Sequence, residues 1–165
     1  MELIDLCDSD KEKAFELYNK FLPDENGFEN SFFGMNYDMF LQACERQRKN
    51  SLGIDLRPGY VPDTKYILVD DEGNYVGVFN FRHYLNDALR NGAGHIGYGI
   101  AKEYRGKGYA SVGLKMVLDI CRERGIDEAY LSVNKDNSAS LRVQIKNGAY
   151  IHHEDDKEYY TRIKL

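Results

Sequence analysis

Hydrophobic positions along the chain follow two different periods, and the change of period predicts which segments are helices and which are strands. Apolar residues spaced by three and four predict helices at 9–21 (capped by Asp8 or Ser9), 37–49, 108–124 and 138–147. Short apolar or alternating runs bounded by Gly, Pro, Asn and Asp predict strands at 3–6, 65–69, 75–84, 95–100, 129–133, 149–152 and 159–164. The segments 53–62 and 86–94 are predicted to be loops.

The segment 108–124 is the clearest helix, because only a narrow polar stripe interrupts its apolar positions. It joins the strands 95–100 and 129–133 as a βαβ unit, so these two strands are expected to pair in parallel. The turn at 70–74 and the end of the chain predict antiparallel hairpins. We therefore expect a mixed α/β (α+β) fold, with a mostly antiparallel sheet and helices on both faces.

Composition indicates one globular domain over residues 1–165, since 42% of the residues are hydrophobic. The three cysteines, Cys7, Cys44 and Cys121, are too far apart to predict a disulfide framework or a metal site. Residues 1–10 are acidic where a signal peptide is basic, and no apolar run is long enough to span a bilayer. These features predict a cytoplasmic protein without a membrane partner.

The net charge of −5 argues against nucleic acid or an anionic membrane as the main partner. Residues 1–50 hold eleven acidic and six basic residues, so this segment accounts for the whole excess. In contrast, residues 102–124 hold six basic and three acidic residues. Such a basic segment indicates either a small anionic ligand or simply a solvated helix face.

The segment Arg105–Ala110 (RGKGYA) lies between a predicted strand and the clearest helix. A helix start has amide groups without partners, and the helix dipole adds positive charge there, so phosphate oxygens are favoured. Gly106 and Gly108 let the backbone approach a pyrophosphate, and Arg105 adds a permanent charge. The glycines at 92–97 match a dinucleotide-binding pattern, but they lead into a strand rather than a helix, so we reject that interpretation.

The segment 105–110 resembles the pyrophosphate-binding motif Arg-x-x-Gly-x-Ala of the GNAT acetyltransferase superfamily. This resemblance implies that 105–110 holds the diphosphate of acetyl-CoA through Arg105, Gly106, Lys107, Gly108, Tyr109 and Ala110. It also implies that the parallel strands 95–100 and 129–133 are splayed apart. The first strand would then expose its backbone edge at Tyr98, Gly99 and Ile100 to the pantetheine arm, where an N–H group could hold the oxyanion. A weak edge strand near a bend is the alternative reading of these glycines.

A second segment, 134–140 followed by Asn147-Gly148-Ala149, resembles the helix of the same family that faces the pantetheine. The resemblance implies that Asn134 and Asn137 bond the pantetheine or phosphate groups, although both are also good turn and cap residues. From about residue 65 to 151, the chain is similar to a bacterial subgroup of predicted GNAT enzymes without assigned substrates.

The family reaction is direct attack of a neutral amine on the thioester, which needs a proton acceptor and a donor for the thiolate. Many members carry the donor tyrosine four residues before the glycine of the second segment, where this chain has Gln144. The candidates are His95 and His83 as bases, Tyr150, Tyr98 or Tyr159 as the acid, or a water chain as the acceptor. The run 152–156 lacks the spacing of a zinc site, and no metal is expected.

The sequence thus predicts an acetyl-CoA-dependent N-acetyltransferase that modifies an amine on a small molecule or peptide, as a monomer or homodimer. The acidic N-terminal segment favours a cationic amine. The absence of tyrosine at Gln144 favours an alternative, a non-catalytic acyl-CoA-binding or sensing module on the same fold. A weaker alternative is another phosphate ligand, such as a nucleotide.

Overall fold

The computed structural model describes every residue from Met1 to Leu165, and it contains two main sheets that lie side by side. The first sheet has four antiparallel strands in the order β1-β4-β5-β6. The second has three antiparallel strands in the order β7-β9-β8. The strands of the two sheets are β1 (Glu2–Asp5), β4 (Asp63–Val69), β5 (Tyr75–Arg82), β6 (Ile96–Ile100), β7 (Glu128–Asn134), β8 (Tyr150–Glu154) and β9 (Glu158–Lys164).

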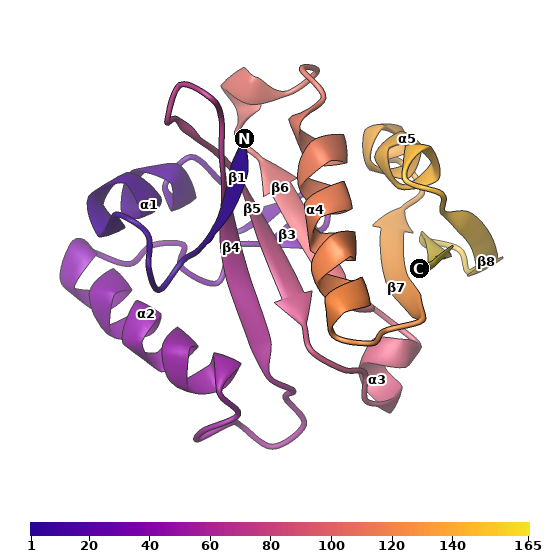
Figure 1. The fold of residues 1–165 in the computed structure, drawn as a ribbon, viewed down its shortest axis with the longest axis horizontal. Helices are drawn as coiled ribbons and strands as arrows, with labels where there is room; N and C mark the ends of the chain where they lie inside the picture. Colours follow the sequence, from indigo (N-terminus) through magenta and orange to yellow (C-terminus); the bar gives the residue numbers. More distant parts are fainter.

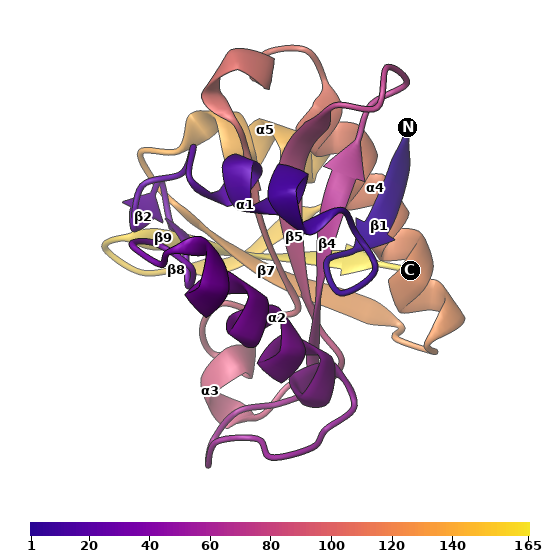
Figure 2. The same cartoon turned by 90° about the vertical axis from the view of Figure 1, so that its left-hand side faces the viewer.

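Helices cover both faces of the first sheet, and this arrangement confirms the mixed α/β fold class. Helices α1 and α2 cross one face, and α4 runs along the other (Figures 1 and 2). A small hairpin of β2 and β3 is separate from both sheets. The remaining elements are α1 (Lys11–Tyr18), β2 (Asp24–Glu25), β3 (Phe28–Glu29), α2 (Tyr37–Ser51), α3 (Asp87–Arg90), a 3₁₀ turn (Lys102–Tyr104), α4 (Tyr109–Glu123) and α5 (Ser138–Lys146).

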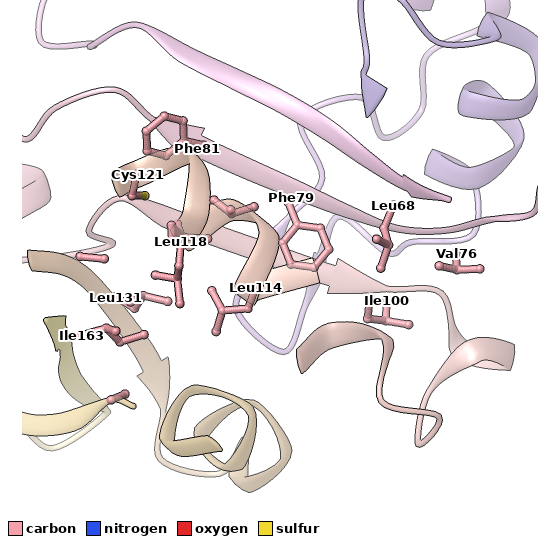
Figure 3. Close-up of a cluster of buried hydrophobic side chains, with 14 residues drawn as sticks. Leu68, Val76, Phe79, Phe81, Ile100, Leu114, Leu118, Cys121, Leu131 and Ile163 are labelled. Atoms are coloured by element: carbon pink, nitrogen blue, oxygen red, sulfur yellow. The ribbon is translucent and has the colours of Figure 1, made fainter. Parts of the chain in front are cut away.

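Helix α4 lies at the centre of the larger hydrophobic core and packs against both sheets (Figure 3). Leu114 and Leu118 of α4 are fully buried with Phe79 of the first sheet, and with Leu131 and Ile163 of the second. A second cluster, which includes Leu17, Phe40 and Val78, lies between the first sheet and the helices α1 and α2. The position of α4 is therefore fixed by two sheets at once, and so is the turn that precedes it.

Strands β6 and β7 run in the same direction (Figure 1) and are splayed apart, as the family resemblance implies, so they do not form the continuous hydrogen-bonded pair that the βαβ pattern alone predicts. They meet only near the end that α3 occupies, through an isolated bridge between Gly94 and Leu131. There the His95 N–H donates to the Tyr130 carbonyl at 2.6 Å. Beyond this contact the strands diverge, because each belongs to a sheet that packs on α4 separately. One edge of β6 is therefore left unpaired.

The structure differs from the sequence predictions at three further places, and each has a local cause. Helix α1 starts at Lys11 rather than after Asp8 or Ser9, because Asp10 caps it by accepting the Lys13 N–H. The hairpin β2–β3 lies between the first two predicted helices, where no strand was predicted, and Asn26 (φ 56°) and Gly27 (φ 88°) form its left-handed turn. The short helix α3 lies within the predicted loop 86–94.

Candidate functional site

The turn before α4 is a concentrated group of free backbone donors. Gly106 (φ 77°) and Gly108 (φ 87°) are left-handed, and Gly108 is the N-cap of α4 without any side-chain cap. The amides of residues 106–110 donate no hydrogen bond within the protein. Five successive free N–H groups at a helix start favour an anion strongly, because the helix dipole adds positive charge at the same point.

Arg105 lies beside this turn and links it to two other segments. Its Nε donates to the Ile100 carbonyl at 2.9 Å, and its Nη2 forms an ion pair with Glu25 of the hairpin. Lys107 is exposed, with its amine 5.3 Å from the centre of the Tyr104 ring. Both cationic side chains that the sequence placed at the turn are therefore present there, although Arg105 also holds the hairpin.

The unpaired edge of β6 begins next to this turn. The Ala101 N–H donates to the Val76 carbonyl, and the Arg82 N–H donates to the His95 carbonyl. The backbone N–H and C=O groups of the odd-numbered residues of β6 therefore point toward β5. The alternation of an antiparallel ladder then directs the N–H and C=O groups of Tyr98 and Ile100 to the open edge, whereas those of Gly99 face β5. Of the three predicted edge residues, two offer free amides to a ligand.

The Tyr98 side chain points from this strand toward α5. Its phenol oxygen lies 2.8 Å from Ser140 Oγ, and its ring stacks on Phe79 at a centroid distance of 5.4 Å. Burial raises the pKa of the Tyr98 phenol, so it keeps its proton at neutral pH. A protonated hydroxyl from β6 therefore lies against the start of α5.

Gln144 occupies the position of the family tyrosine and is fully engaged in the protein. It is 1% exposed, its Oε1 accepts from Thr161 Oγ1 at 2.6 Å, and its Nε2 donates to the Ser132 carbonyl at 3.4 Å. These bonds tie α5 to β7 and β9. Gln144 is thus a structural residue that holds the second sheet to its helix.

The hairpin β2–β3 crosses the open end of the gap between β6 and β7. Besides the ion pair of Glu25 with Arg105, the hairpin makes two contacts at this end. The Asn26 carbonyl accepts a hydrogen bond from Asn137 Nδ2 at 3.0 Å, and Gly27 lies against Asn134. Asn137 also caps α5 by accepting the Ser140 N–H at 3.0 Å. Asn134 and Asn137 therefore lie at the mouth of the gap, facing the hairpin. The Asn-Gly pair at 26–27 was the sequence signal that would have located this hairpin.

His95 lies at the closed end of the gap and is held there. Its Nδ1 accepts the Tyr130 N–H at 3.0 Å, and it is 5% exposed. Burial, reinforced by three nearby arginines, lowers the pKa of His95 to about 4. The neutral ring therefore carries its proton on Nε2, and the nitrogen that would accept a proton is already used.

His83 and Tyr150 lie near the same end. His83 and His95 both line a cavity of about 280 Å³, together with Tyr84, Leu85, Arg90, Ile126, Glu128 and Tyr130. Burial and Arg124 lower the pKa of His83, whose Nε2 lies 2.8 Å from Thr64 Oγ1. The Tyr150 phenol donates to Glu128 at 2.8 Å, and this bond raises its pKa. Two of the three candidate catalytic residues, His83 and His95, thus line one cavity, and the third, Tyr150, is bonded to Glu128 of its wall.

Two further observations concern metals and membranes. No group of three or more His, Cys, Asp or Glu side chains is placed to hold a metal ion, and this includes the adjacent His152 and His153. None of the helices is both long and apolar enough to cross a membrane.

Solved structures with this arrangement of sheets and helices are acetyltransferases. Spermidine N-acetyltransferase from Vibrio cholerae, in complex with CoA and spermine, superimposes with a TM-score of 0.67 at 16% identity over 99% of this chain and 94% of that one. Ribosomal-protein-S5-alanine acetyltransferase from Vibrio fischeri gives 0.64 at 17% identity, over 98% and 91%. The Campylobacter jejuni N-acetyltransferase PseH gives 0.62 at 14% identity, over 99% and 97%.

The family follows from the sequence match. The model of the acetyltransferase (GNAT) domain matches residues 9–150, which is most of the chain. This chain therefore belongs to the GNAT acetyltransferase family, as the motif at 105–110 predicted. No curated protein matches it significantly.

Proposed function

We propose that this protein transfers the acetyl group of acetyl-CoA to a primary amine of a small molecule or peptide. The observation that carries the proposal is the run of five free amides at 106–110, beside the open edge of β6. Membership of the GNAT family supports an acetyl donor of this kind. The V. cholerae enzyme of the same fold, solved with CoA and spermine, supports both CoA and an amine as ligands.

The diphosphate of acetyl-CoA would occupy the turn, where the amides of 106–110 donate to its oxygens. Arg105 adds a permanent positive charge and keeps its Nη1 group available, since only Nε and Nη2 are engaged. Lys107 adds a second charge. The pantetheine arm would extend along β6 and pair with the free N–H of Ile100 and the free carbonyl of Tyr98, while Asn134 and Asn137 flank it from the other side of the gap.

In the reaction, the amine nitrogen attacks the thioester carbonyl, the carbon–sulfur bond breaks, and CoA leaves as a thiolate. The free N–H group of Tyr98, which lies farther from the diphosphate turn than Ile100, is the donor for the negative charge that develops on the carbonyl oxygen. We assign protonation of the thiolate to the Tyr98 phenol, because Gln144 is fully engaged and Tyr98 directs a protonated hydroxyl to the same helix.

The amine must lose one proton, and His83 is the better placed of the two histidines to accept it. His83 Nδ1 has no partner in the protein, whereas His95 uses Nδ1 to accept the Tyr130 N–H. The lowered pKa of His83 keeps the ring neutral at pH 7, as a base requires. Water in the cavity would relay the proton if the amine does not reach the ring directly.

The test is to incubate the protein with acetyl-CoA, a thiol reagent and a broad panel of amines. We expect amine-dependent release of CoA, and a decrease of about 100-fold in kcat for Tyr98→Phe at an unchanged KM for acetyl-CoA. Binding of acetyl-CoA without thiol release for any amine would favour the non-catalytic module instead. A larger thermal shift with ATP than with CoA would favour a nucleotide ligand.

A further inference from the structure

Two arginines lie against the Tyr130 ring at the closed end of the gap between β6 and β7, and a third lies nearby. The Arg162 guanidinium lies 3.7 Å from the centre of the Tyr130 ring, and that of Arg90 lies 5.8 Å from it. Arg82 donates through Nη1 to the Gly94 carbonyl at 3.1 Å, one residue before His95. These side chains come from β9, α3 and β5, so only the folded chain brings them together.

None of these three arginines forms an ion pair. The eight ion pairs of the chain involve other residues, and the single hydrogen bond of Arg162 goes from Nη1 to its neighbour's carbonyl, Thr161 O, at 2.9 Å. Arg162 is only 4% exposed, yet no buried side-chain nitrogen in the chain lacks a partner. Its Nε and Nη2 donors therefore reach accessible space and remain free for a ligand.

Arg82, Arg90 and Arg162 bring three positive charges to this end of the gap, although the protein as a whole is acidic. Glu128 is the one acidic residue that lines the cavity, where it accepts a hydrogen bond from Tyr150, and Asp63 and Glu29 act on Arg82. All three arginines contribute to the lowered pKa of His95, which shows that their charges converge there. A buried guanidinium without a counter-charge is unfavourable, and a bound anion would relieve this.

The cavity beside the arginines has the size and position of a subsite. Its volume of about 280 Å³ is lined by Arg90, His95, Tyr130 and Glu128, among others, and Arg162 lies beside it against the Tyr130 ring. It adjoins the closed end of the gap, where the His95 N–H meets the Tyr130 carbonyl. From Ile100 to His95 the strand spans about 17 Å, so an arm that starts at the turn and follows β6 would end close to this cavity.

We propose that this cavity binds the anionic group of the acceptor, so that the acceptor is an amine that also carries a carboxylate or phosphate. The proposal rests on the proposed function, because it treats the ligand of the cavity as the acetyl acceptor. It assigns Arg90 and Arg162 as specificity-determining residues, with Arg82 adding positive charge beside them. A polyamine, which the acidic N-terminal segment favours, would be repelled by the three guanidinium groups.

The first experiment measures the anion directly and does not depend on activity. The side-chain Nε–Hε signals of the arginines are followed by NMR while succinate, and separately inorganic phosphate, is added to the full-length protein. We expect the Arg90 and Arg162 signals to shift with either anion, and the affinity to fall at least tenfold in Arg90→Gln. Arg90 is exposed, so this variant should fold, and Arg142→Gln on the surface of α5 is the matched control. Unchanged Arg90 and Arg162 signals would overturn the proposal.

The second experiment compares matched acceptors. Lysine and cadaverine differ by one carboxylate, so comparing them as acceptors tests whether a carboxylate is recognised. Phosphoethanolamine and ethanolamine provide the same comparison for a phosphate. We expect at least tenfold higher kcat/KM for one anionic member, with the preference lost in Arg90→Gln and kept in Arg142→Gln. A preference for cadaverine, or one that Arg90→Gln leaves unchanged, would refute the subsite. Absence of transfer to every amine would refute the proposed function instead, while the NMR titration would still report the anion site.

Discussion

The free amide of Tyr109 offers a sharp test of phosphate binding, because proline can remove it without disturbing the helix. Tyr109 is the first residue of α4, the position where proline is best tolerated. Gly108 precedes it and has no Cβ, so only its own N–H approaches the proline ring at its ψ of −5°; backbone NMR shifts of the unliganded variants check that Gly108 keeps its conformation. Tyr109→Pro deletes one N–H donor together with the side chain, and Tyr109→Ala deletes the side chain alone. The difference between the two variants isolates the amide.

The magnitude follows from the state of this amide in the fold. It donates no bond within the protein, so a phosphate oxygen would gain a charge-assisted hydrogen bond of about 1.5–3 kcal/mol. CoA should therefore bind about 10- to 150-fold more weakly to Tyr109→Pro than to Tyr109→Ala. Isothermal titration calorimetry measures the CoA affinity of both variants, and thermal unfolding checks that both are folded. Pantetheine, which lacks phosphates, should not distinguish the variants.

Equal CoA affinities for the two folded variants would refute this reasoning, because the amide would then contribute nothing to binding. A difference that persists with pantetheine would also contradict it, since the effect would then not involve the diphosphate.

Three further predictions concern the scaffold around the site. Gly113→Ala places a methyl group 2.2 Å from Phe79 Cζ. We expect the free energy of unfolding, measured in urea, to fall by about 1–2 kcal/mol, although alanine has the better helix propensity. A variant as stable as the wild type would contradict the tight contact of α4 with β5. Thr161→Val removes the buried donor to Gln144 and should cost about 1–3 kcal/mol, with normal stability as the contrary result. The pKa of His95 is about 4 in the fold against 6.5 in the unfolded chain, so the unfolded state binds more protons between these values and stability falls as pH drops through them. From pH 7 to 5 the wild type should lose about 2 kcal/mol more than His95→Asn, and parallel pH profiles of the two proteins would disprove the assignment.

The fold was largely predictable where local pattern and packing agree. The apolar face of α4 and its bounding glycines located the helix and the turn before it, because burial against two sheets requires that pattern. The hairpin β2–β3 was not predicted, since its strands of two residues are too short for periodicity to show. The separation of β6 from β7 was predicted only through the family resemblance, because it depends on how two sheets share one helix and no local pattern shows it.

The candidate site was predictable only in its backbone part. Residues 106–110 are proposed to bind through their amides, whose freedom follows from a glycine-rich turn at a helix start, and both features are local in sequence. The bonds of Tyr98 with Ser140 and of Glu25 with Arg105 join residues 42 and 80 positions apart. Such contacts depend on tertiary packing, so no spacing rule would have shown them.

The measurement that tests the central claim most directly is an amide NMR titration of the intact protein with CoA. The account predicts that the largest shifts fall on the amides of 106–110, followed by those of Tyr98 and Ile100, and that they saturate together. Binding that leaves the amides of 106–110 unchanged, or no binding to the folded protein, would contradict it.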